Sequence, residues 1–285
     1  MSDAASDLNA KRLRLEWLLR DLGSVAVAFS GGADSTLVLA VARQVLGREK
    51  VLAITAKGTL FAPDEAAEAQ DVAARLDVTH ETVETRQLDL PHFRKNPPDR
   101  CYHCKKEILG PVFAMAKAHG LAAVCDGGNA DDTGVWRPGI KAAAEMGVRS
   151  PLKEAGFTKA DVRALSKELN LPTWDRPAMP CLSTRFPYGQ PITEEGLKRV
   201  AAAESVLAQL GYSGFRVRDH GTVARIEVAP GDIARLVGTD RERVARDIKA
   251  FGYAYVTVDL EGYRSGAMDE VIRRSPGVSP EGAGP

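Results

Sequence analysis

The sequence lacks any surplus of charge: in a chain of 285 residues, Lys plus Arg total 38 and Asp plus Glu total 38. This balance gives no support to a surface that binds a polyanion such as nucleic acid. The chain also lacks long apolar runs, and none approaches the ~20 residues of a membrane-spanning helix. The first residues, Met1 to Asn9, are polar and contain no apolar signal-peptide core. We therefore expect a cytoplasmic protein that binds neither nucleic acid nor a membrane.

Cysteine is scarce, and the chain holds only four, at Cys101, Cys104, Cys125 and Cys181. In a cytoplasmic chain of this length, catalysis or metal binding is a more common use of such residues than a pair of disulfides. Hydrophobic residues make up 44% and charged residues 27%, which is ordinary soluble composition. The length allows one large or two ordinary domains with a well-buried core.

The first half of the chain alternates short apolar segments with helical stretches. Strands are predicted at 25–29, 51–55, 78–83 and 122–125, and helices at 35–45, 63–76 and about 105–119, the last with a possible break at Gly110-Pro111. Alternation of this kind predicts a parallel sheet with helices on both faces. Ligands of such sheets bind beyond the carboxyl ends of the strands. The loops after the first, second and fourth strands would meet at that edge.

The second half begins with a segment that has few helical options. Residues 174–191 hold four prolines around Cys181, and Asn96-Pro97-Pro98 similarly introduces the first cysteine pair. Beyond residue 191 we predict a helix at 193–210 capped by Thr193, strands at 215–219, 223–228 and 254–260, and helices at 231–236 and 241–251. These elements make a small α+β unit. The tail at 274–285 is rich in Pro, Gly and Ser and is predicted to be disordered.

The segment Ser30-Gly31-Gly32-Ala33-Asp34-Ser35 lies directly between an apolar strand and a helix. Paired glycines let the backbone turn so that its N–H groups point at an anion, and the helix N-terminus adds positive character. Ser30 and Ser35 can offer hydroxyls to the same phosphates, while Asp34 can orient the loop or approach a metal ion. A Walker loop would need a lysine before its last Ser or Thr. The alternative interpretation is an ordinary glycine turn capped by serine.

This segment resembles the PP-loop of ATP pyrophosphatases, which cleave ATP between the α and β phosphates. The resemblance implies that a substrate oxygen attacks the α phosphorus, giving an adenylate and pyrophosphate. It also implies that ATP is used together with Mg2+, and that the phosphates are held by Ser30, Gly31, Gly32, Asp34 and Ser35. The superfamily includes NAD synthetase, GMP synthetase, argininosuccinate synthetase and several tRNA thiolases. The loop alone does not choose among them.

Further segments narrow the choice: 96–105 with its Cys-x-x-Cys, 126–132, 137–139, 148–152 and 176–185. Together they resemble the LarE family, the ATP-dependent sulfur transferases that make the nickel-pincer nucleotide cofactor of lactate racemase. The resemblance runs from about Leu13 to about Ile272, and its most specific part is Pro-Cys-Leu-x-x-Arg-Phe-Pro-Tyr-Gly around Cys181. Gly128 departs from the family, in which threonine is more often expected at that position.

The resemblance implies a small nucleotide substrate, a pyridinium biscarboxylate mononucleotide, whose carboxylates are activated by adenylation. A sulfur derived from cysteine then displaces AMP and leaves a thiocarboxylate. Cys181 occupies the position of the sulfur-handling cysteine. In one branch of the family that cysteine gives up its own sulfur and becomes dehydroalanine. In another branch, three cysteines hold a 4Fe–4S cluster whose unique iron carries an extra sulfide.

The cysteine pattern favours the cluster branch, with Cys101, Cys104 and Cys181 as ligands. A sacrificial thiolate requires one cysteine, so Cys101 and Cys104 would have no task. Cys-x-x-Cys supplies two soft ligands on one loop, and a third cysteine leaves one coordination position open. Basic neighbours would favour thiolates, namely Arg100, Lys105, Lys106, Arg176 and Arg185. The alternatives are a structural zinc site that also uses Cys125, and no metal at all. Cys125 ends an apolar strand and is most simply a small buried residue.

A phosphorylated, doubly carboxylated substrate requires cations. Arg216 and Arg218 alternate along a predicted strand and therefore share one face, and Arg225 lies on the neighbouring strand. Together with Arg185, these arginines could hold a phosphate or a carboxylate through two-point hydrogen bonds. The alternative for these arginines is a solvated face of the sheet.

The acids of interest are found in a loop and in the second half. Asp131 and Asp132 follow the fourth predicted strand, where they could reach magnesium or the substrate, or be solvated loop acids. Glu204 and Glu227 are candidates for the same pocket as the arginines. His220 precedes a glycine in a predicted hairpin and is interpreted as a turn residue.

We thus predict an α/β protein whose parallel-sheet, adenine-nucleotide alpha-hydrolase-like (PP-loop) domain is followed by a smaller α+β domain. The expected boundaries are a disordered N-terminus at 1–12, the PP-loop domain at 13–175, a sulfur-transfer domain at 176–273 and a disordered tail at 274–285. The resemblance also suggests a homo-oligomer. A tRNA thiolase is the nearest alternative, although the balanced charge and the absence of a zinc-ribbon pair count against it. A nucleotide-binding module without turnover is the alternative from another class.

Overall fold

The computed structural model describes residues 3–61, 64–133, 138–176, 181–264 and 266–270. Contacts divide the chain into two compact units, one of residues 1–86 and 101–179 and the other of residues 87–100 and 180–285. Residues 87–100 thus group with the second half, which the linear boundaries predicted from the sequence did not anticipate. The predicted disordered tail and Pro177 and Pro180 of the proline-rich segment lie outside the described residues.

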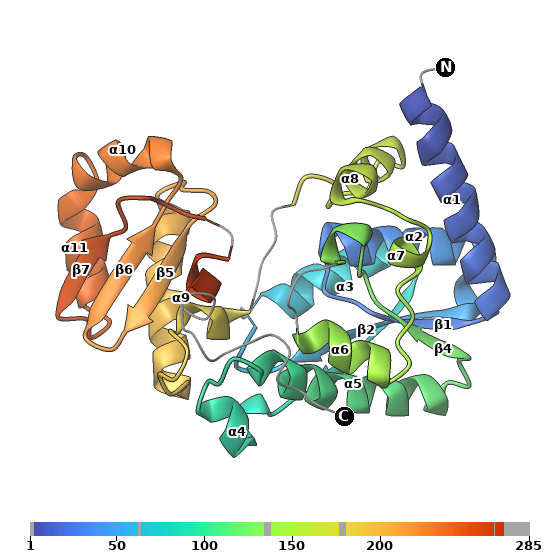
Figure 1. The fold of residues 1–285 in the computed structure, drawn as a ribbon, viewed down its shortest axis with the longest axis horizontal. Coiled ribbons are helices and arrows are strands. Elements are labelled where there is room, and N and C mark those ends of the chain that lie inside the picture. Colours follow the sequence, from blue (N-terminus) through green and yellow to red (C-terminus); the bar gives the residue numbers. More distant parts are fainter. Residues whose placement is uncertain (1–2, 62–63, 134–137, 177–180, 265, 271–285) are drawn as a thin grey trace. The chain divides into compact units, whose positions relative to one another are not determined.

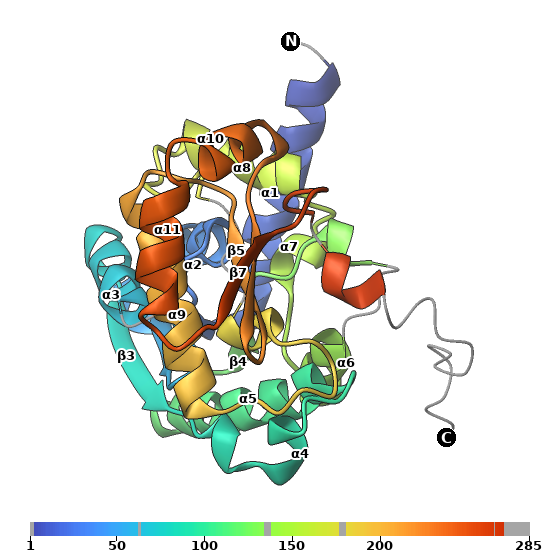
Figure 2. The same cartoon turned by 90° about the vertical axis from the view of Figure 1, so that its left-hand side faces the viewer.

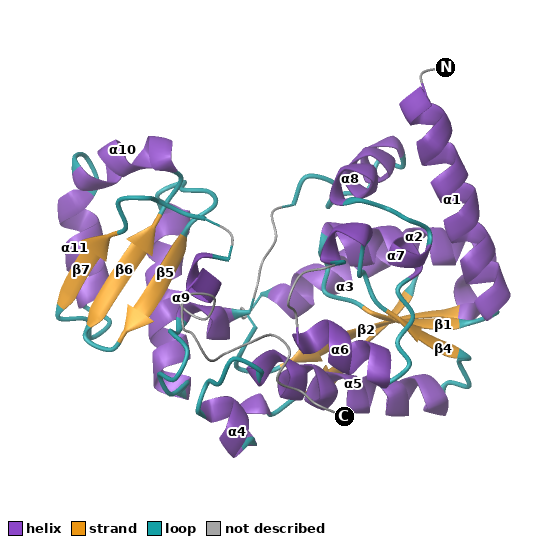
Figure 3. Cartoon of the chain, in the orientation of Figure 1, coloured by secondary structure: helices purple, strands orange, loops and turns teal. Residues whose placement is uncertain are grey.

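The first unit is built on a four-stranded parallel sheet (Figures 1 and 3), as predicted. Its strands are β1 (Val25–Ala28), β2 (Val51–Lys57), β3 (Thr79–Glu84) and β4 (Ala123–Cys125), in the order β3-β2-β1-β4. β1 is wholly apolar and so are the first four residues of β2, as is typical of strands covered on both faces. Because the strands are parallel, the loops after β1 and β4 leave from the same edge.

Helices cover both faces of this sheet (Figure 1). Successive residues of β1 point to opposite sides, so Val25 and Val27 join one apolar core while Ala26 joins another. The first core is completed by α1 (Asp3–Leu22), α2 (Ala33–Leu46), α3 (Glu65–Arg75), α7 (Pro151–Glu154) and α8 (Lys159–Glu168). The second is completed by α5 (Arg100–Ala118). The part of this unit that the structure describes also contains α6 (Pro138–Glu145).

Two helices of this unit differ from the prediction. α1 begins at Asp3, within the N-terminal segment expected to be disordered, and its residues Leu15 and Leu19 are fully buried. Burial of this apolar stripe, rather than helix propensity, accounts for the ordered helix. α5 starts at Arg100 and runs through Gly110-Pro111 without ending there. The Cys-x-x-Cys motif therefore lies on a helix and not on a loop.

The second unit is a small α+β structure, as predicted. Its sheet has the order β5-β6-β7, with β5 (Arg216–His220) antiparallel to β6 (Val223–Glu227) and β6 parallel to β7 (Tyr255–Val258). Val217, Ala224 and Ile226 point from one face into a core with α9 (Glu194–Gln209) and α11 (Arg241–Lys249), helices that Figure 2 shows beside the sheet. The unit also contains α4 (Pro91–Arg94) and α10 (Ile233–Val237). None of the helices described in either unit is long and apolar enough to cross a membrane.

Candidate functional site

The segment from Ser30 to Ser35 forms a tight turn between β1 and α2. Gly31 has φ +67°, a left-handed conformation that glycine adopts without strain. The hydroxyl oxygens of Ser30 and Ser35 lie 3.1 Å apart, and the Ser35 hydroxyl donates to the Gly32 carbonyl at 3.2 Å. Gly32 is the N-cap of α2, so no capping side chain covers the N–H groups of the first turn. Backbone donors, a helix N-terminus and two hydroxyls together can cradle phosphates.

Asp34, in the first turn of α2, is held by two side chains from distant parts of the sequence. The Asn129 amide donates to one carboxylate oxygen at 3.1 Å, and the Lys159 ammonium forms an ion pair with the other. Asn129 follows β4 and Lys159 is the first residue of α8. Nothing in the sequence pattern pointed to Lys159, because it lies 125 residues from Asp34.

The loop after β4 lies directly against the turn between β1 and α2. A side chain at Gly127 would come within 2.8 Å of the Ser35 backbone nitrogen, so only glycine fits there. A Cβ at the neighbouring Gly128 would stand 3.0 Å from the Ser150 hydroxyl, which donates to Asp126 at 2.7 Å. The space that a threonine side chain would need at residue 128 is therefore partly filled by Ser150.

Asp131 and Asp132 both accept hydrogen bonds from backbone N–H groups. Asp131 accepts from Lys159 at 2.8 Å, and Asp132 accepts from Asn129 at 3.1 Å. These bonds fix the main chain at the two residues whose side chains reach Asp34. The contacts described for Asp131 and Asp132 thus organise the site indirectly. Their predicted contact with magnesium or substrate stays a prediction.

The five basic residues expected near the cysteines each have a partner within their own unit. In the first unit, Arg176 donates to the Gly31 carbonyl at 3.2 Å and forms an ion pair with Glu68. Lys105 lies 3.7 Å from the Asp126 carboxylate, and Lys106 lies 3.0 Å from that of Glu145.

In the second unit, Arg100 stacks on the Tyr188 ring and Arg185 pairs with Glu204. Of these five residues, Arg176 is thus the one whose described contacts include the phosphate loop.

All four cysteines are outside disulfides. Cys101 and Cys104 are half-buried in the first turn of α5, and spacing of three residues puts both side chains on one side of a helix. Cys181 belongs to the second unit. Cys125 ends β4 and is fully buried, and burial, with a smaller effect of Asp126, raises the pKa of its thiol to about 12. That thiol is neutral at ordinary pH and unsuited to nucleophilic or metal chemistry.

The chain around Cys181 is anchored to helix α9. Cys181 is the N-cap of a short 3-10 helix, Leu182–Arg185, and its sulfur lies 2.8 Å from the hydroxyl of the buried Ser183. Arg185 donates to the Cys181 carbonyl at 3.2 Å and holds both carboxylate oxygens of Glu204 at 2.8 Å. Through these contacts, Arg185 connects the backbone of Cys181 to Glu204 on α9 and fixes its position. The contact with Ser183 is not predictable from the sequence, because this residue lies within the motif but carries no pattern of its own.

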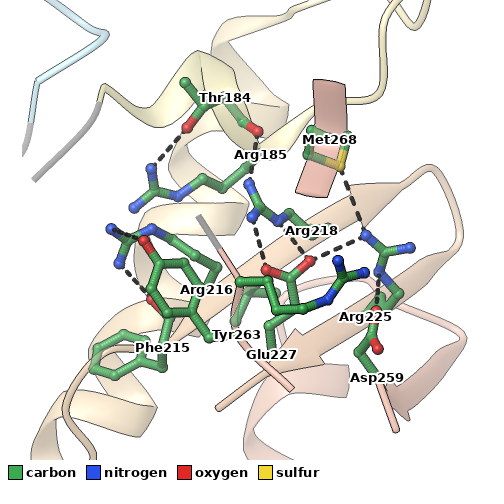
Figure 4. Close-up of polar contacts among 12 residues, drawn as sticks. Thr184, Arg185, Phe215, Arg216, Arg218, Arg225, Glu227, Asp259, Tyr263 and Met268 are labelled. Atoms are coloured by element: carbon green, nitrogen blue, oxygen red, sulfur yellow. Dashed lines mark hydrogen bonds and ion pairs between the residues drawn. The ribbon is translucent and has the colours of Figure 1, made fainter. Parts of the chain in front are cut away.

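Arg218 and Arg225 lie directly opposite each other on β5 and β6, and Arg216 shares their face, as predicted (Figure 4). Arg218 holds both carboxylate oxygens of Glu227, at 2.9 and 2.7 Å. The exposed fractions of the two side chains are 6% and 1%, so this pair is buried. Arg225 contacts Glu227 at 3.0 Å and Asp259 at 3.5 Å. Glu227 therefore serves as the counter-ion of two arginines.

Arg216 has a different environment, with the guanidinium 4.9 Å from the Tyr263 ring and donating to the Phe215 carbonyl at 2.5 Å (Figure 4). Burial lowers the pKa of Arg216 below its ordinary value, and the neighbouring positive charge of Arg185 lowers it further. The Glu204 carboxylate, which pairs with Arg185, acts on Arg216 in the opposite sense. A half-buried guanidinium is a charge-assisted hydrogen-bond donor for an anion. The arrangement can therefore accept a phosphate or a carboxylate.

The amino-acid sequence is similar to one family model and to several known proteins. The asparagine synthase family model matches residues 17–122. An uncharacterized protein of Synechocystis sp. is 44% identical over 94% of this chain and 100% of its own length. Pyridinium-3,5-bisthiocarboxylic acid mononucleotide synthase of Lactiplantibacillus plantarum is 41% identical over 94% of this chain and 97% of its own length. Argininosuccinate synthase of Halobacterium salinarum is 31% identical over 53% of this chain and 40% of its own length.

Proposed function

This chain belongs to the LarE family of PP-loop ATP pyrophosphatases, and from that premise we propose that it converts the carboxylates of pyridinium-3,5-biscarboxylic acid mononucleotide to thiocarboxylates, for the nickel-pincer cofactor of lactate racemase. The observation that carries the proposal is the 41% identity to the Lactiplantibacillus plantarum synthase over 94% of the chain. The geometry of the turn from Ser30 to Ser35 supports the use of ATP in the reaction.

The first step is the activation of a carboxylate. A carboxylate oxygen of the substrate attacks the α phosphorus of ATP, the bond from that phosphorus to the bridging oxygen breaks, and pyrophosphate leaves with the electron pair. Backbone donors of the loop and the Ser30 and Ser35 hydroxyls hold the phosphates. We assign Asp34 to a Mg2+ ion that binds with ATP, since carboxylate oxygens are ligands that Mg2+ prefers. In the second step a sulfur nucleophile adds to the activated carbon and AMP leaves.

The products of ATP test the proposal. Incubation with ATP, Mg2+ and the biscarboxylate mononucleotide should release AMP and pyrophosphate in equal amounts. The appearance of ADP and orthophosphate would contradict it. We also expect a cytoplasmic homo-oligomer that does not retard tRNA in a gel-shift assay, whereas a tRNA thiolase must bind tRNA.

We propose that the arginine face of the second unit binds the anionic groups of the substrate. Arg185 and Arg218 already form two-point ion pairs with Glu204 and Glu227, so their loss would also leave a carboxylate without its partner. The contacts described for Arg216 are instead with the Tyr263 ring and the Phe215 carbonyl. Arg216 is therefore the arginine whose replacement separates substrate binding from folding most clearly.

Replacing Arg216 with glutamine should raise the KM of the mononucleotide about 10- to 100-fold, the usual effect of losing a charge-assisted hydrogen bond. The KM of ATP should change little, because the PP-loop belongs to the other unit. Steady-state kinetics with each substrate varied in turn makes the comparison. Arg243→Gln, on the exposed side of α11, is the matched control. Equal losses for both substrates would assign Arg216 to the fold instead.

We propose further that Cys101, Cys104 and Cys181 hold a 4Fe–4S cluster. The fit rests on the donor set. Two half-buried thiols lie on one side of the first turn of α5, and the thiol of Cys181 is also half-buried, whereas that of Cys125 is fully buried and neutral. Three protein ligands leave one iron of such a cluster open. When bound, the cluster would supply the sulfide for the activated carboxylate. Arg185 and Glu204 would keep the Cys181 backbone in place.

A further inference from the structure

We propose that His80 is a positioning residue for the phosphate loop, whose first peptide group it orients through the hydroxyl of Thr55. This inference rests on the proposed function, which assigns the phosphates of ATP to the turn from Ser30 to Ser35. His80 lies on β3, Thr55 lies on β2, and Phe29 directly precedes the turn. Two hydrogen bonds join these three residues, so that β3 is connected through β2 to the start of the loop.

The register of the parallel sheet brings the side chains of His80 and Thr55 together. On β2 and β3, His80 stands opposite Ala53, and Thr55 stands opposite Thr82. Because side chains alternate along a strand, all four of these side chains lie on one face of the sheet. Nε2 of His80 lies 2.8 Å from the Thr55 hydroxyl oxygen. The Thr55 side chain is buried and the imidazole is half-buried, so the contact belongs to the interior of the first unit.

The direction of both hydrogen bonds follows from the hydrogens that are available. The Thr55 hydroxyl lies 2.7 Å from the Phe29 carbonyl oxygen, which can only accept. Thr55 therefore donates its one hydrogen to Phe29 and accepts the second hydrogen bond from Nε2 of His80. Burial lowers the pKa of His80, and the positive charge of Lys57 lowers it further. The imidazole is thus neutral at ordinary pH, and its single hydrogen is on Nε2.

A fixed Phe29 carbonyl also fixes the N–H of Ser30, because both groups belong to one planar peptide unit. That N–H points to the Ser35 hydroxyl oxygen, 3.4 Å away, and so into the turn. The N–H of Phe29 itself donates to the Ile54 carbonyl at 2.8 Å. The His80 ring packs edge-on against the Phe29 ring, with the ring centres 6.3 Å apart and the planes at 79°. The first backbone donor of the phosphate loop therefore has its direction set before any phosphate binds.

Binding of pyrophosphate to the full-length protein, followed by calorimetry, tests the inference with three variants of His80. Glutamine can place its amide nitrogen where Nε2 stands, whereas asparagine is one methylene shorter and leucine has no donor. His80→Gln should therefore keep the affinity within about twofold of wild type. His80→Asn and His80→Leu should weaken it about 3- to 10-fold, the effect of losing one neutral hydrogen bond. His119→Leu, which removes an imidazole that pairs with Glu81 in the same unit, is the matched control and should leave the affinity unchanged.

Unchanged pyrophosphate affinity in His80→Leu would overturn the inference. An equal loss in all three variants would also overturn it, because the packing of the ring and not its hydrogen bond would then matter. Thr55→Val breaks the same connection, so adding His80→Leu to Thr55→Val should cause little further loss. Additive losses would show that the two residues act separately and would contradict the proposed connection.

The tautomer of His80 provides a test that needs no variant and decides the matter if a variant fails to fold. Long-range 1H–15N spectra of the wild-type protein should place the imidazole hydrogen on Nε2. A hydrogen on Nδ1 would overturn the inference, since Thr55 would then donate to His80 and could not hold the Phe29 carbonyl. Neither measurement needs the carboxylate substrate. Failure of the proposed function would instead appear in wild type, as a lack of AMP and pyrophosphate release during turnover.

Discussion

Replacing Asp34 with asparagine is expected to reduce the release of AMP and pyrophosphate by at least about 100-fold, the scale on which single electrostatic groups act in such sites. Asparagine keeps the size of the side chain and one oxygen but loses the charge that faces Lys159 and that would hold Mg2+. Both partners in the ion pair are partly exposed, so the change in the free energy of unfolding should not exceed about 1 kcal/mol.

A coupled assay for pyrophosphate measures the rate, and thermal melting measures the stability of the variant. Asp71→Asn, an exposed acid on α3, provides the control and should retain full activity. Turnover of Asp34→Asn close to the wild-type rate would mean that the acid of the loop takes no part in the chemistry. A large loss of stability would mean that Asp34 acts mainly through the fold.

Replacing Cys181 with alanine should stop thiocarboxylate formation, while the first release of pyrophosphate persists. Adenylation depends on the PP-loop of the first unit, and Cys181 belongs to the second. Cys125→Ala provides a control of the same residue type. Its thiol is buried and neutral, with a pKa of about 12. That substitution should lower stability by about 1 kcal/mol through lost packing and leave sulfur transfer intact. Sulfur transfer by Cys181→Ala would exclude a direct role for this cysteine.

The two mechanisms for Cys181 give different measurements on anaerobically purified protein. The cluster predicts a brown protein with about four irons per chain, and replacing Cys101, Cys104 or Cys181 should bleach it. The sacrificial mechanism predicts a colourless protein in which Cys101 and Cys104 are dispensable. Mass spectrometry after turnover would then find one H2S lost at Cys181. Dehydroalanine at that position would end the cluster proposal.

The parts of the fold that were predictable from sequence are those whose signals are local. A few adjacent residues are enough to predict the turn from Ser30 to Ser35. The same is true of the alternation of β1, α2 and β2. The N-terminal helix was missed because the first nine residues are polar. The signal lies further along α1, where Leu15 and Leu19 are buried. The start of α5 at Arg100 was likewise hidden by the Asn-Pro-Pro segment before it.

The candidate site was predictable in its residues but not in its pairings. Period-two alternation placed Arg216 and Arg218 on one face, yet it did not indicate that Glu227 would neutralise Arg218 and Arg225. That pairing depends on strand register, which is set by the whole unit. Lys159 and Asn129 reach Asp34 from 125 and 95 residues away. Contacts of this kind arise only when the chain folds, so a single sequence carries no pattern for them.

The most direct test of sulfur insertion is the mass of the mononucleotide after incubation of wild-type protein with ATP, Mg2+ and, if required, a sulfide source under anaerobic conditions. We expect a product in which sulfur has replaced one oxygen in each carboxylate, formed together with AMP and pyrophosphate and absent without ATP. A mononucleotide of unchanged mass, recovered while AMP and pyrophosphate accumulate, would contradict the claim that this protein transfers sulfur.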